Sequence, residues 1–137
     1  MLGGVKVPSA KGLLGHSDAD VLLHALCDAL LGAVGAGDIG TYFPDTDPRW
    51  KGAPSRIFVE KALELVASKG LKVGNVDLVA ITEEPKLAPH RKAITESVAG
   101  MLQVGADQVN LKAKTMEKLG PIGAGEAMAA YAVVLLE

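Results

Sequence analysis

A short window near the amino terminus holds most of the side chains that could do chemistry. Asp20, His24 and Asp28 recur every four residues, so on a helix they form one stripe, with Cys27 beside it. An imidazole next to carboxylates is either a hydrogen-bonded core pair or a metal ligand whose second ring nitrogen is oriented by a carboxylate. The stripe alone leaves both interpretations open.

The helix that carries this stripe is predicted over residues 18–33. It follows the glycine-bounded loop 12–15, and its apolar positions are expected to pack on a sheet. We expect Ser17 to cap its first turn, where Asp18 and Asp20 suit the positive end of the helix dipole.

The other elements follow from hydrophobic periodicity. It predicts helices over residues 55–69 and 89–103, and strands over residues 4–8, 76–82, 109–115 and 127–136. This order predicts an α+β fold in α/β layers, a mixed β-sheet with helices on one face. Small residues in the last strand (Ala127, Ala129, Ala130 and Ala132) would let another surface approach the sheet closely.

Composition limits the location and the partners. The chain has 137 residues, 49% of them hydrophobic, and a net charge of −2. Its Lys and Arg residues do not cluster, which argues against nucleic acid or an anionic membrane as partner. The single cysteine excludes an internal disulfide, and no targeting segment or membrane-length apolar run is recognised, so we expect a cytoplasmic protein. Because the chain is so apolar, we expect part of its apolar surface to be buried in an oligomer interface.

The glycine-, proline- and aspartate-rich segment 35–54 is expected to be a long functional loop. Residues 35–40 match the dinucleotide fingerprint G-x-G-x-x-G. That fingerprint requires a preceding strand, and here it follows a predicted helix, so NAD binding is not expected. Asp45 and Asp47 could accept hydrogen bonds from sugar-like hydroxyls or could build turns, and turn formation is the simpler interpretation.

Two more loops follow predicted strands. Residues 82–90 (Thr-Glu-Glu-Pro-Lys-Leu-Ala-Pro-His) could offer free N–H groups to a base or a phosphate, or could be a solvated turn. Residues 114–120 (Lys-Thr-Met-Glu-Lys-Leu-Gly) bring a hydroxyl, a carboxylate and two ammonium groups.

Together these segments resemble one family over essentially the whole chain. The motifs are His-Ser-Asp-x-Asp-x-x-x-His, Gly-Asp-Ile-Gly-x-x-Phe-Pro-Asp-Thr-Asp-Pro, Gly-Asn-Val-Asp, Pro-Lys-x-x-Pro-His and Lys-Thr-x-Glu-Lys-Leu-Gly. Their order and spacing are similar to those of the 2-C-methyl-D-erythritol 2,4-cyclodiphosphate synthases of the non-mevalonate isoprenoid pathway. The resemblance implies one synthase domain over residues 1–137 and a homotrimer with active sites between subunits. It also implies conversion of 4-diphosphocytidyl-2-C-methyl-D-erythritol 2-phosphate into the cyclic diphosphate and CMP.

The implied reaction needs charge neutralisation more than a base. The attacking phosphate is already anionic, whereas three clustered phosphates repel one another and this acidic chain offers little positive charge. Divalent ions are therefore expected to neutralise and align the phosphates.

The resemblance further implies roles for individual residues. His24 would bind Zn²⁺ with Asp28 supporting it, Glu117 would bind Mg²⁺ or Mn²⁺, and His16 and Thr115 would stabilise the transition state. The implied methylerythritol phosphate site comprises Ser17, Asp38, Ile39, Gly40, Phe43, Pro44, Asp45, Thr46 and Asp47. The implied nucleotide pocket comprises Thr82, Glu83, Glu84, Pro85, Lys86, Leu87, Ala88, Lys114 and Met116.

The chain departs from the family pattern at three places. The family opens with a strand bearing Asp-x-His, which supplies two more zinc ligands, and this chain begins beyond that point. His24 alone is therefore expected to bind zinc weakly. Pro121 and Ala124 stand where many relatives have phenylalanine and an arginine that can bind a diphosphate in the central cavity. Lys114, a threonine in some relatives, adds a charge near the expected phosphates.

Two alternative functions remain open from the sequence. A metal-dependent phosphohydrolase also carries His and Asp on a helix, although the adjacent His-Asp pair expected there is missing. A catalytically impaired, trimeric ligand-binding form would account for the missing opening strand.

Overall fold

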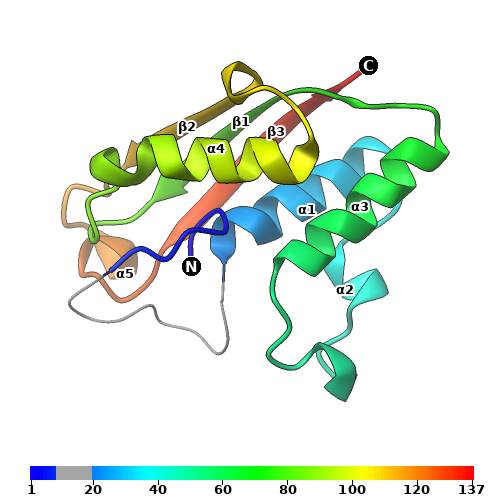
Figure 1. Cartoon of the computed structure of the whole chain (residues 1–137). Helices are drawn as coiled ribbons and strands as arrows, with labels where there is room; N and C mark the ends of the chain where they lie inside the picture. Colours follow the sequence, from blue (N-terminus) through cyan, green and yellow to red (C-terminus); the bar gives the residue numbers. More distant parts are fainter. Residues whose placement is uncertain (9–19) are drawn as a thin grey trace.

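A mixed three-stranded sheet forms the centre of the molecule (Figure 1). The structure is a computed structural model, and it describes residues 1–8 and 20–137. β1 (Val73–Ile81) lies in the middle, parallel to β2 (Val109–Lys114) and antiparallel to β3 (Ala129–Leu136). β1 is thus the central strand that its apolar sequence predicts.

Three long helices cover one face of this sheet (Figure 1). α1 (Val21–Ala33) packs on β3 and β1, α4 (Arg91–Leu102) packs on β2, and α3 (Arg56–Ser68) packs on α1. The predicted fold class is confirmed. The shorter elements are α2 (Ile39–Tyr42), α5 (Gly120–Gly123) and the 3₁₀ turns η1 (Pro48–Trp50), η2 (Ala88–His90) and η3 (Ala106–Gln108). Within residues 1–8 and 20–137, none of the helices has the length and apolarity that a bilayer crossing requires.

The sheet and α1 enclose the core. Leu78 of β1 is completely buried and lies opposite Leu111 of β2 and Ala132 of β3. From the helix side the core is filled by buried α1 side chains, which are Leu22, Leu23, Leu26, Cys27, Leu30 and Leu31. Burial of this apolar surface is the main stabilising contribution to the fold.

We expect Leu78→Ala to lower the free energy of unfolding by about 2–5 kcal/mol, because it removes buried methyl groups and leaves a cavity. Urea unfolding followed by circular dichroism measures the change. Leu71→Ala is the matched control, since Leu71 is 37% exposed, and a change within about 0.5 kcal/mol is expected there. Equal losses for the two variants would contradict the central place of Leu78 in the core.

The amino-terminal predictions need two corrections. α1 begins at Val21, not at residue 18, and Asp20 is its N-cap, the role predicted for Ser17. Ser17 itself lies outside the described residues. No strand spans residues 4–8, because positive φ angles at Gly3 and Gly4 turn the chain there, leaving only an isolated bridge between Leu2 and Val5.

The predicted loop 35–54 is more regular than expected. An aspartate begins each of its two short helical elements, Asp38 before α2 and Asp47 before η1, and each accepts a backbone N–H with its side chain. The glycine fingerprint at residues 35–40 follows α1 and leads into α2, so the strand that dinucleotide binding requires is absent from these described residues.

The small residues of β3 do not all face outward. Ala130 and Ala132 pack against the helix side of the sheet, where they let α1 approach β3. The opposite face presents Tyr131, Val133 and Leu135, which are 63%, 70% and 65% exposed. The surface that approaches the small residues at positions 130 and 132 is thus helix α1, and strand alternation places the larger residues on the outer face.

Candidate functional site

Asp20 anchors the turn of α1 that carries His24. Its fully buried carboxylate accepts hydrogen bonds from the backbone N–H groups of Gly3 at 2.8 Å, Gly4 at 2.7 Å and Leu23 at 3.1 Å. Its carbonyl oxygen accepts the N–H of His24 at 3.0 Å. These bonds satisfy a buried charge and join the start of the chain to the helix. Asp20 therefore has a structural role in the stripe that the sequence singled out.

His24 faces α3. Its Nε2 lies 3.0 Å from Oγ of Ser55, and its ring centroid is 5.5 Å from that of Phe58. Asp28 is exposed, and its carboxylate accepts the backbone N–H of Ile39 at 2.8 Å. Among the hydrogen bonds of the described residues, none joins Asp28 to His24, so the core pair considered from the sequence is not formed there.

A cavity of about 670 Å³ lies beside His24. It collects most of the residues predicted for the methylerythritol phosphate site, which are Ile39, Gly40, Phe43, Pro44, Asp45, Thr46 and Asp47. Asp38 is not part of the lining, because its carboxylate accepts the N–H of Thr41 at 3.2 Å and caps α2. Ser17 and His16 lie outside the described residues. Sequence reasoning missed Trp50, Lys51 and Phe58, although Trp50 is the chain's single tryptophan.

Aromatic rings line one side of this cavity. The ring of Phe43 lies 4.6 Å from that of Phe58 and 4.8 Å from that of Trp50, centroid to centroid. Such edge and tilted contacts stabilise aromatic clusters and hold the loop against α3. Trp50 Nε1 is buried and has no hydrogen-bond partner among the described atoms. The lining also includes Asp45, Thr46 and Lys51, so the cavity suits a molecule with both apolar and oxygen-rich parts.

Asp47 forms a turn, as the simpler interpretation proposed. Its Oδ1 accepts the N–H of Arg49 at 3.0 Å, and the Arg49 guanidinium donates to its Oδ2 at 2.7 Å. The hydrogen bonds from Arg49 are the main reason that the pKa of Asp47 lies below its usual value. Asp47 therefore stays ionised at neutral pH and organises the cavity wall. Asp45 is exposed at the same wall.

Cys27 is buried behind the His24 stripe and donates to the carbonyl oxygen of Phe58 at 3.3 Å. Burial, and secondly the charge of Asp28, raise the pKa of its thiol to about 12. The raised pKa means that the folded protein favours the neutral thiol. The contribution of Cys27 to the free energy of unfolding is therefore fully present below the unfolded pKa of 9.0 and is lost as the pH rises towards about 12.

We expect Cys27 to resist thiol reagents in the native protein. At pH 8 the thiolate is the reactive form and is nearly absent, and the side chain is inaccessible. Dithionitrobenzoate should label less than about a tenth of the protein over an hour, and all of it in guanidinium chloride. Rapid stoichiometric labelling of folded protein would contradict this placement.

A second candidate site lies where the parallel strands β1 and β2 end. Both loops that follow them meet there, joined by the N–H of Thr82 and the carbonyl oxygen of Lys114 at 3.0 Å. They enclose a cavity of about 180 Å³. Its lining includes Thr82, Glu83, Pro85, Lys86, Leu87, Ala88, Lys114 and Thr115. Glu84 and Met116 are not in this lining, and Arg91 and Ala113 were missed from the sequence.

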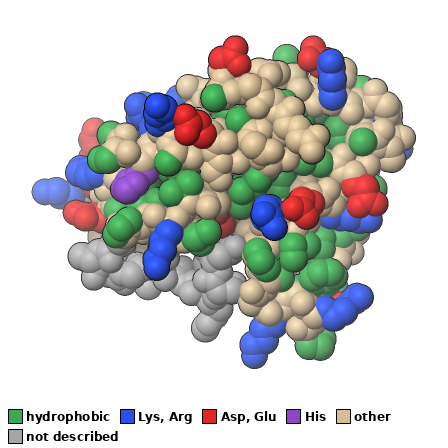
Figure 2. Space-filling view, viewed as in Figure 1, with side chains coloured by type: hydrophobic (Ala, Val, Ile, Leu, Met, Phe, Trp, Pro, Cys, Tyr) green, Lys and Arg blue, Asp and Glu red, His purple; other side chains and the backbone are tan. Residues whose placement is uncertain are grey.

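Cations border this second cavity. Lys86 and Lys114 extend from the two loops, and Arg91 lies at the start of α4. Ammonium and guanidinium groups bind phosphate oxygens through charge-assisted hydrogen bonds. The helix-covered surface as a whole carries acidic and basic side chains intermixed (Figure 2), so the positive charge at this cavity is local.

The described residues do not by themselves assemble a metal site. No group of three or more His, Cys, Asp or Glu side chains within residues 1–8 and 20–137 is placed to hold an ion. Glu117 is exposed on the turn after β2, where its N–H donates to Oγ1 of Thr115 at 3.3 Å. His24 offers one imidazole. A catalytic zinc site normally has three protein ligands, so the described residues do not fit zinc without further ligands.

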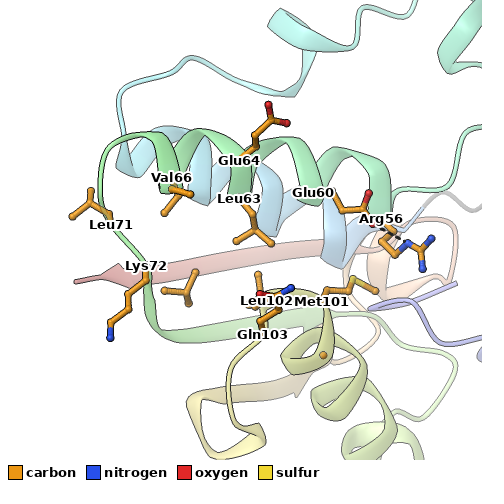
Figure 3. Close-up of a pocket in the computed structure, with 13 residues that line it drawn as sticks. Arg56, Glu60, Leu63, Glu64, Val66, Leu71, Lys72, Met101, Leu102 and Gln103 are labelled. Atoms are coloured by element: carbon orange, nitrogen blue, oxygen red, sulfur yellow. Dashed lines mark ion pairs between the residues drawn. The ribbon is translucent and has the colours of Figure 1, made fainter.

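Another cavity, of about 680 Å³, separates α3 from α4 (Figure 3). Leu63, Val66 and Leu102 contribute apolar lining, and Arg56 and Glu60 form an ion pair at its border at 3.2 Å. None of the residues predicted for the site lines it. We therefore do not include it in the candidate functional site.

The whole chain matches a known protein family and several enzymes of one name. The model of the YgbB family matches residues 1–137. A 2-C-methyl-D-erythritol 2,4-cyclodiphosphate synthase of Synechococcus sp. (strain JA-2-3B'a(2-13)) is 56% identical over 136 residues, covering 99% of this chain and 87% of the relative. The enzyme of the same name from Azotobacter vinelandii (strain DJ / ATCC BAA-1303) is 57% identical, covering 98% and 86%.

Solved structures agree with these relatives. A 2C-methyl-D-erythritol-2,4-cyclodiphosphate synthase structure in a CDP-bound form has a TM-score of 0.90 and 46% identity, covering all of this chain and 89% of its own. The bifunctional IspDF structure from Campylobacter jejuni has a TM-score of 0.93 and 41% identity, covering 99% of this chain and 37% of its own. The similarity therefore includes both the sequence and the fold.

Proposed function

The chain belongs to the YgbB family, and on that premise we propose that it converts 4-diphosphocytidyl-2-C-methyl-D-erythritol 2-phosphate into the 2,4-cyclodiphosphate with release of CMP. It is thus a phosphorus–oxygen lyase of isoprenoid biosynthesis, formed by one domain over residues 1–137. The observation that carries the proposal is the match of the full chain to synthases at 56–57% identity. The two cavities beside His24 and at the ends of β1 and β2 provide the binding sites.

In the reaction an oxygen of the 2-phosphate attacks the β-phosphorus of the diphosphate. The bond between the β-phosphorus and the bridging oxygen breaks, and CMP leaves with that oxygen. The nucleophile is already an anion, so no proton has to be removed from it. The main task of the protein is to hold the flexible substrate in a folded conformation. Restricting the two ends of one molecule in this way gives the rate advantage of an intramolecular reaction.

The cavity beside His24 is proposed to hold the methylerythritol phosphate. Phe43, Phe58 and Trp50 supply an apolar wall for the methyl-bearing carbon chain. Lys51 supplies a cation on the same lining. Asp38 shapes this cavity through its cap on α2, and Asp45 is free of the arginine contact that engages Asp47.

The cavity at the ends of β1 and β2 is proposed to hold the cytidine diphosphate part. The loop 82–88 offers backbone groups to the base, and Lys86, Lys114 and Arg91 face the phosphates with positive charge. Thr115 lies at the edge where the two loops meet, and its hydroxyl is proposed to act on the reacting phosphates together with His16. A relative solved with CDP supports a nucleotide in this fold.

We propose a homotrimer whose active sites lie between subunits. Tyr131, Val133 and Leu135 form an exposed apolar row on the sheet face that the helices leave uncovered. An apolar row that is exposed in a single subunit is usually buried in the contact between subunits. Three chains of 14.1 kDa would give a native mass of about 42 kDa, which light scattering measures. A mass of one chain would exclude the trimer.

A metal requirement completes the proposal. His24 would give one ligand to Zn²⁺, and Glu117 would bind Mg²⁺ or Mn²⁺, which would supply positive charge to the substrate phosphates. Bound divalent ions neutralise phosphoryl oxygens as Lewis acids. Because the described residues do not complete a three-ligand site, zinc needs donors beyond them. The single cysteine is a free, buried thiol, which supports a reducing compartment and a cytoplasmic location.

The function is tested by incubating purified protein with the diphosphocytidyl substrate, Mg²⁺ and Zn²⁺. The expected products are CMP and the cyclic diphosphate in equal amounts, separated by chromatography and identified by ³¹P NMR. Release of inorganic phosphate without the cyclic product would indicate a phosphohydrolase and overturn the proposal. Substrate binding without turnover would overturn it in favour of a ligand-binding role.

A further inference from the structure

Glu83 joins the two loops that follow β1 and β2. Its carboxylate oxygen Oε1 accepts the backbone N–H of Met116 at 3.0 Å and that of Lys118 at 2.8 Å. The partners are 33 and 35 positions away in sequence, so this is a tertiary contact between the loops. Two converging N–H donors are a favourable arrangement for a carboxylate.

The turn held by Glu83 has an unfavourable backbone. Glu117 has φ +51° and Lys118 has φ +66°, in the left-handed region that residues with a side chain rarely adopt. The bond from Glu117 N to Thr115 Oγ1 is long, at 3.3 Å, and all residues of the turn are exposed. Such a conformation persists only when surrounding contacts impose it. The two bonds to Glu83 tie this turn to the loop after β1, and Gly123 packs against the backbone of Lys118 from the other direction along the chain.

From this geometry we infer that Glu83 is a positioning residue, whose carboxylate holds residues 115–118 in the shape that presents Thr115 and Glu117 to the reacting phosphates. The inference rests on the proposed function for the importance of those two residues. Sequence resemblance assigned Glu83 to nucleotide binding, and the residue does border that cavity. The oxygen that faces the turn, however, is occupied by two main-chain donors, so its main effect passes through the turn.

Two substitutions test the inference. Glu83→Ala removes the acceptor and should lower kcat about 10–100-fold, the range typical of groups that support a functional residue. The KM for substrate should change less than about threefold, because the nucleotide contacts of the other loop remain. Glu83→Gln keeps a carbonyl oxygen in the same place without the charge, and should restore kcat to within about threefold of the native value. Glu96→Ala, an exposed glutamate on α4, is the matched control.

Two kinetic outcomes would overturn the inference. If Glu83→Gln fails as completely as Glu83→Ala, the charge matters and the residue acts directly on the phosphates or a cation. If Glu83→Ala raises KM and leaves kcat unchanged, the residue contacts the nucleotide itself.

A measurement independent of activity separates this inference from the proposed function. In hydrogen exchange followed by NMR, the amides of Met116 and Lys118 should be protected in the native protein and in Glu83→Gln. In Glu83→Ala both should exchange at least about tenfold faster. Unchanged protection in Glu83→Ala would show that Glu83 does not hold the turn, whatever the reaction. Loss of protection in a Glu83→Ala protein, where the unsubstituted protein makes no CMP, would support the positioning role of Glu83 and refute only the proposed function.

Discussion

Replacing His24 with alanine is expected to lower kcat/KM for CMP formation at least about 100-fold. Removing a group that merely supports a metal ligand costs about 10–100-fold, so loss of the side chain proposed as the ligand should cost more. The steady-state rate of CMP release is the measurement. The affinity for added Zn²⁺, measured by titration calorimetry, should fall together with activity.

His90→Ala is the matched control for this prediction. His90 lies in η2 and does not line the cavity beside His24, so activity within about threefold of the native value is expected. Ser55, whose Oγ lies 3.0 Å from His24 Nε2, has to remain in place, and circular dichroism of His24→Ala checks that α1 and α3 are still packed. Native activity and zinc affinity in His24→Ala would remove His24 from the catalytic site.

Replacing Val133 with aspartate is expected to convert the proposed trimer into single chains and to abolish CMP formation. Val133 is 70% exposed in the middle of the apolar row on β3, and an aspartate there would bury an uncompensated charge in each subunit. Such burial costs several kcal/mol per charge, which a trimer has to bear three times. Light scattering should report about 14.1 kDa in place of three times that mass. Activity is lost because each proposed active site needs a neighbouring subunit.

Leu71→Asp controls for the introduction of a carboxylate. Leu71 is also exposed and apolar, but it lies between α3 and β1, not on the outer sheet face. This variant should keep the trimeric mass and activity within about threefold. A trimer that persists in Val133→Asp would show that the outer face of β3 is not the interface.

Local sequence patterns predicted the main elements well. Ser55 to Lys69 was expected to be an amphipathic helix that stops at Gly70, and α3 spans Arg56–Ser68, with a positive φ at Gly70. Helix and strand periods differ, so a long apolar pattern identifies its element without tertiary information. A predicted helix boundary was wrong where a long-range contact, and not the local sequence pattern, selected the capping residue. The N-cap of α1 moved from Ser17 to Asp20, whose carboxylate also binds Gly3 and Gly4 across the fold.

By itself the sequence determined the three long helices, the three sheet strands, the central position of β1 and the family, because these depend on short-range periodicity and on residue types in order. Only the tertiary structure decided which polar groups meet. In the folded chain His24 Nε2 lies within hydrogen-bond distance of Ser55 Oγ, 31 positions away. The carboxylate of Asp28 accepts the backbone N–H of Ile39, and that of Glu83 accepts the N–H groups of Met116 and Lys118. Hydrogen bonds depend on distance and direction to within a fraction of an ångström, and those quantities exist only after the chain has packed.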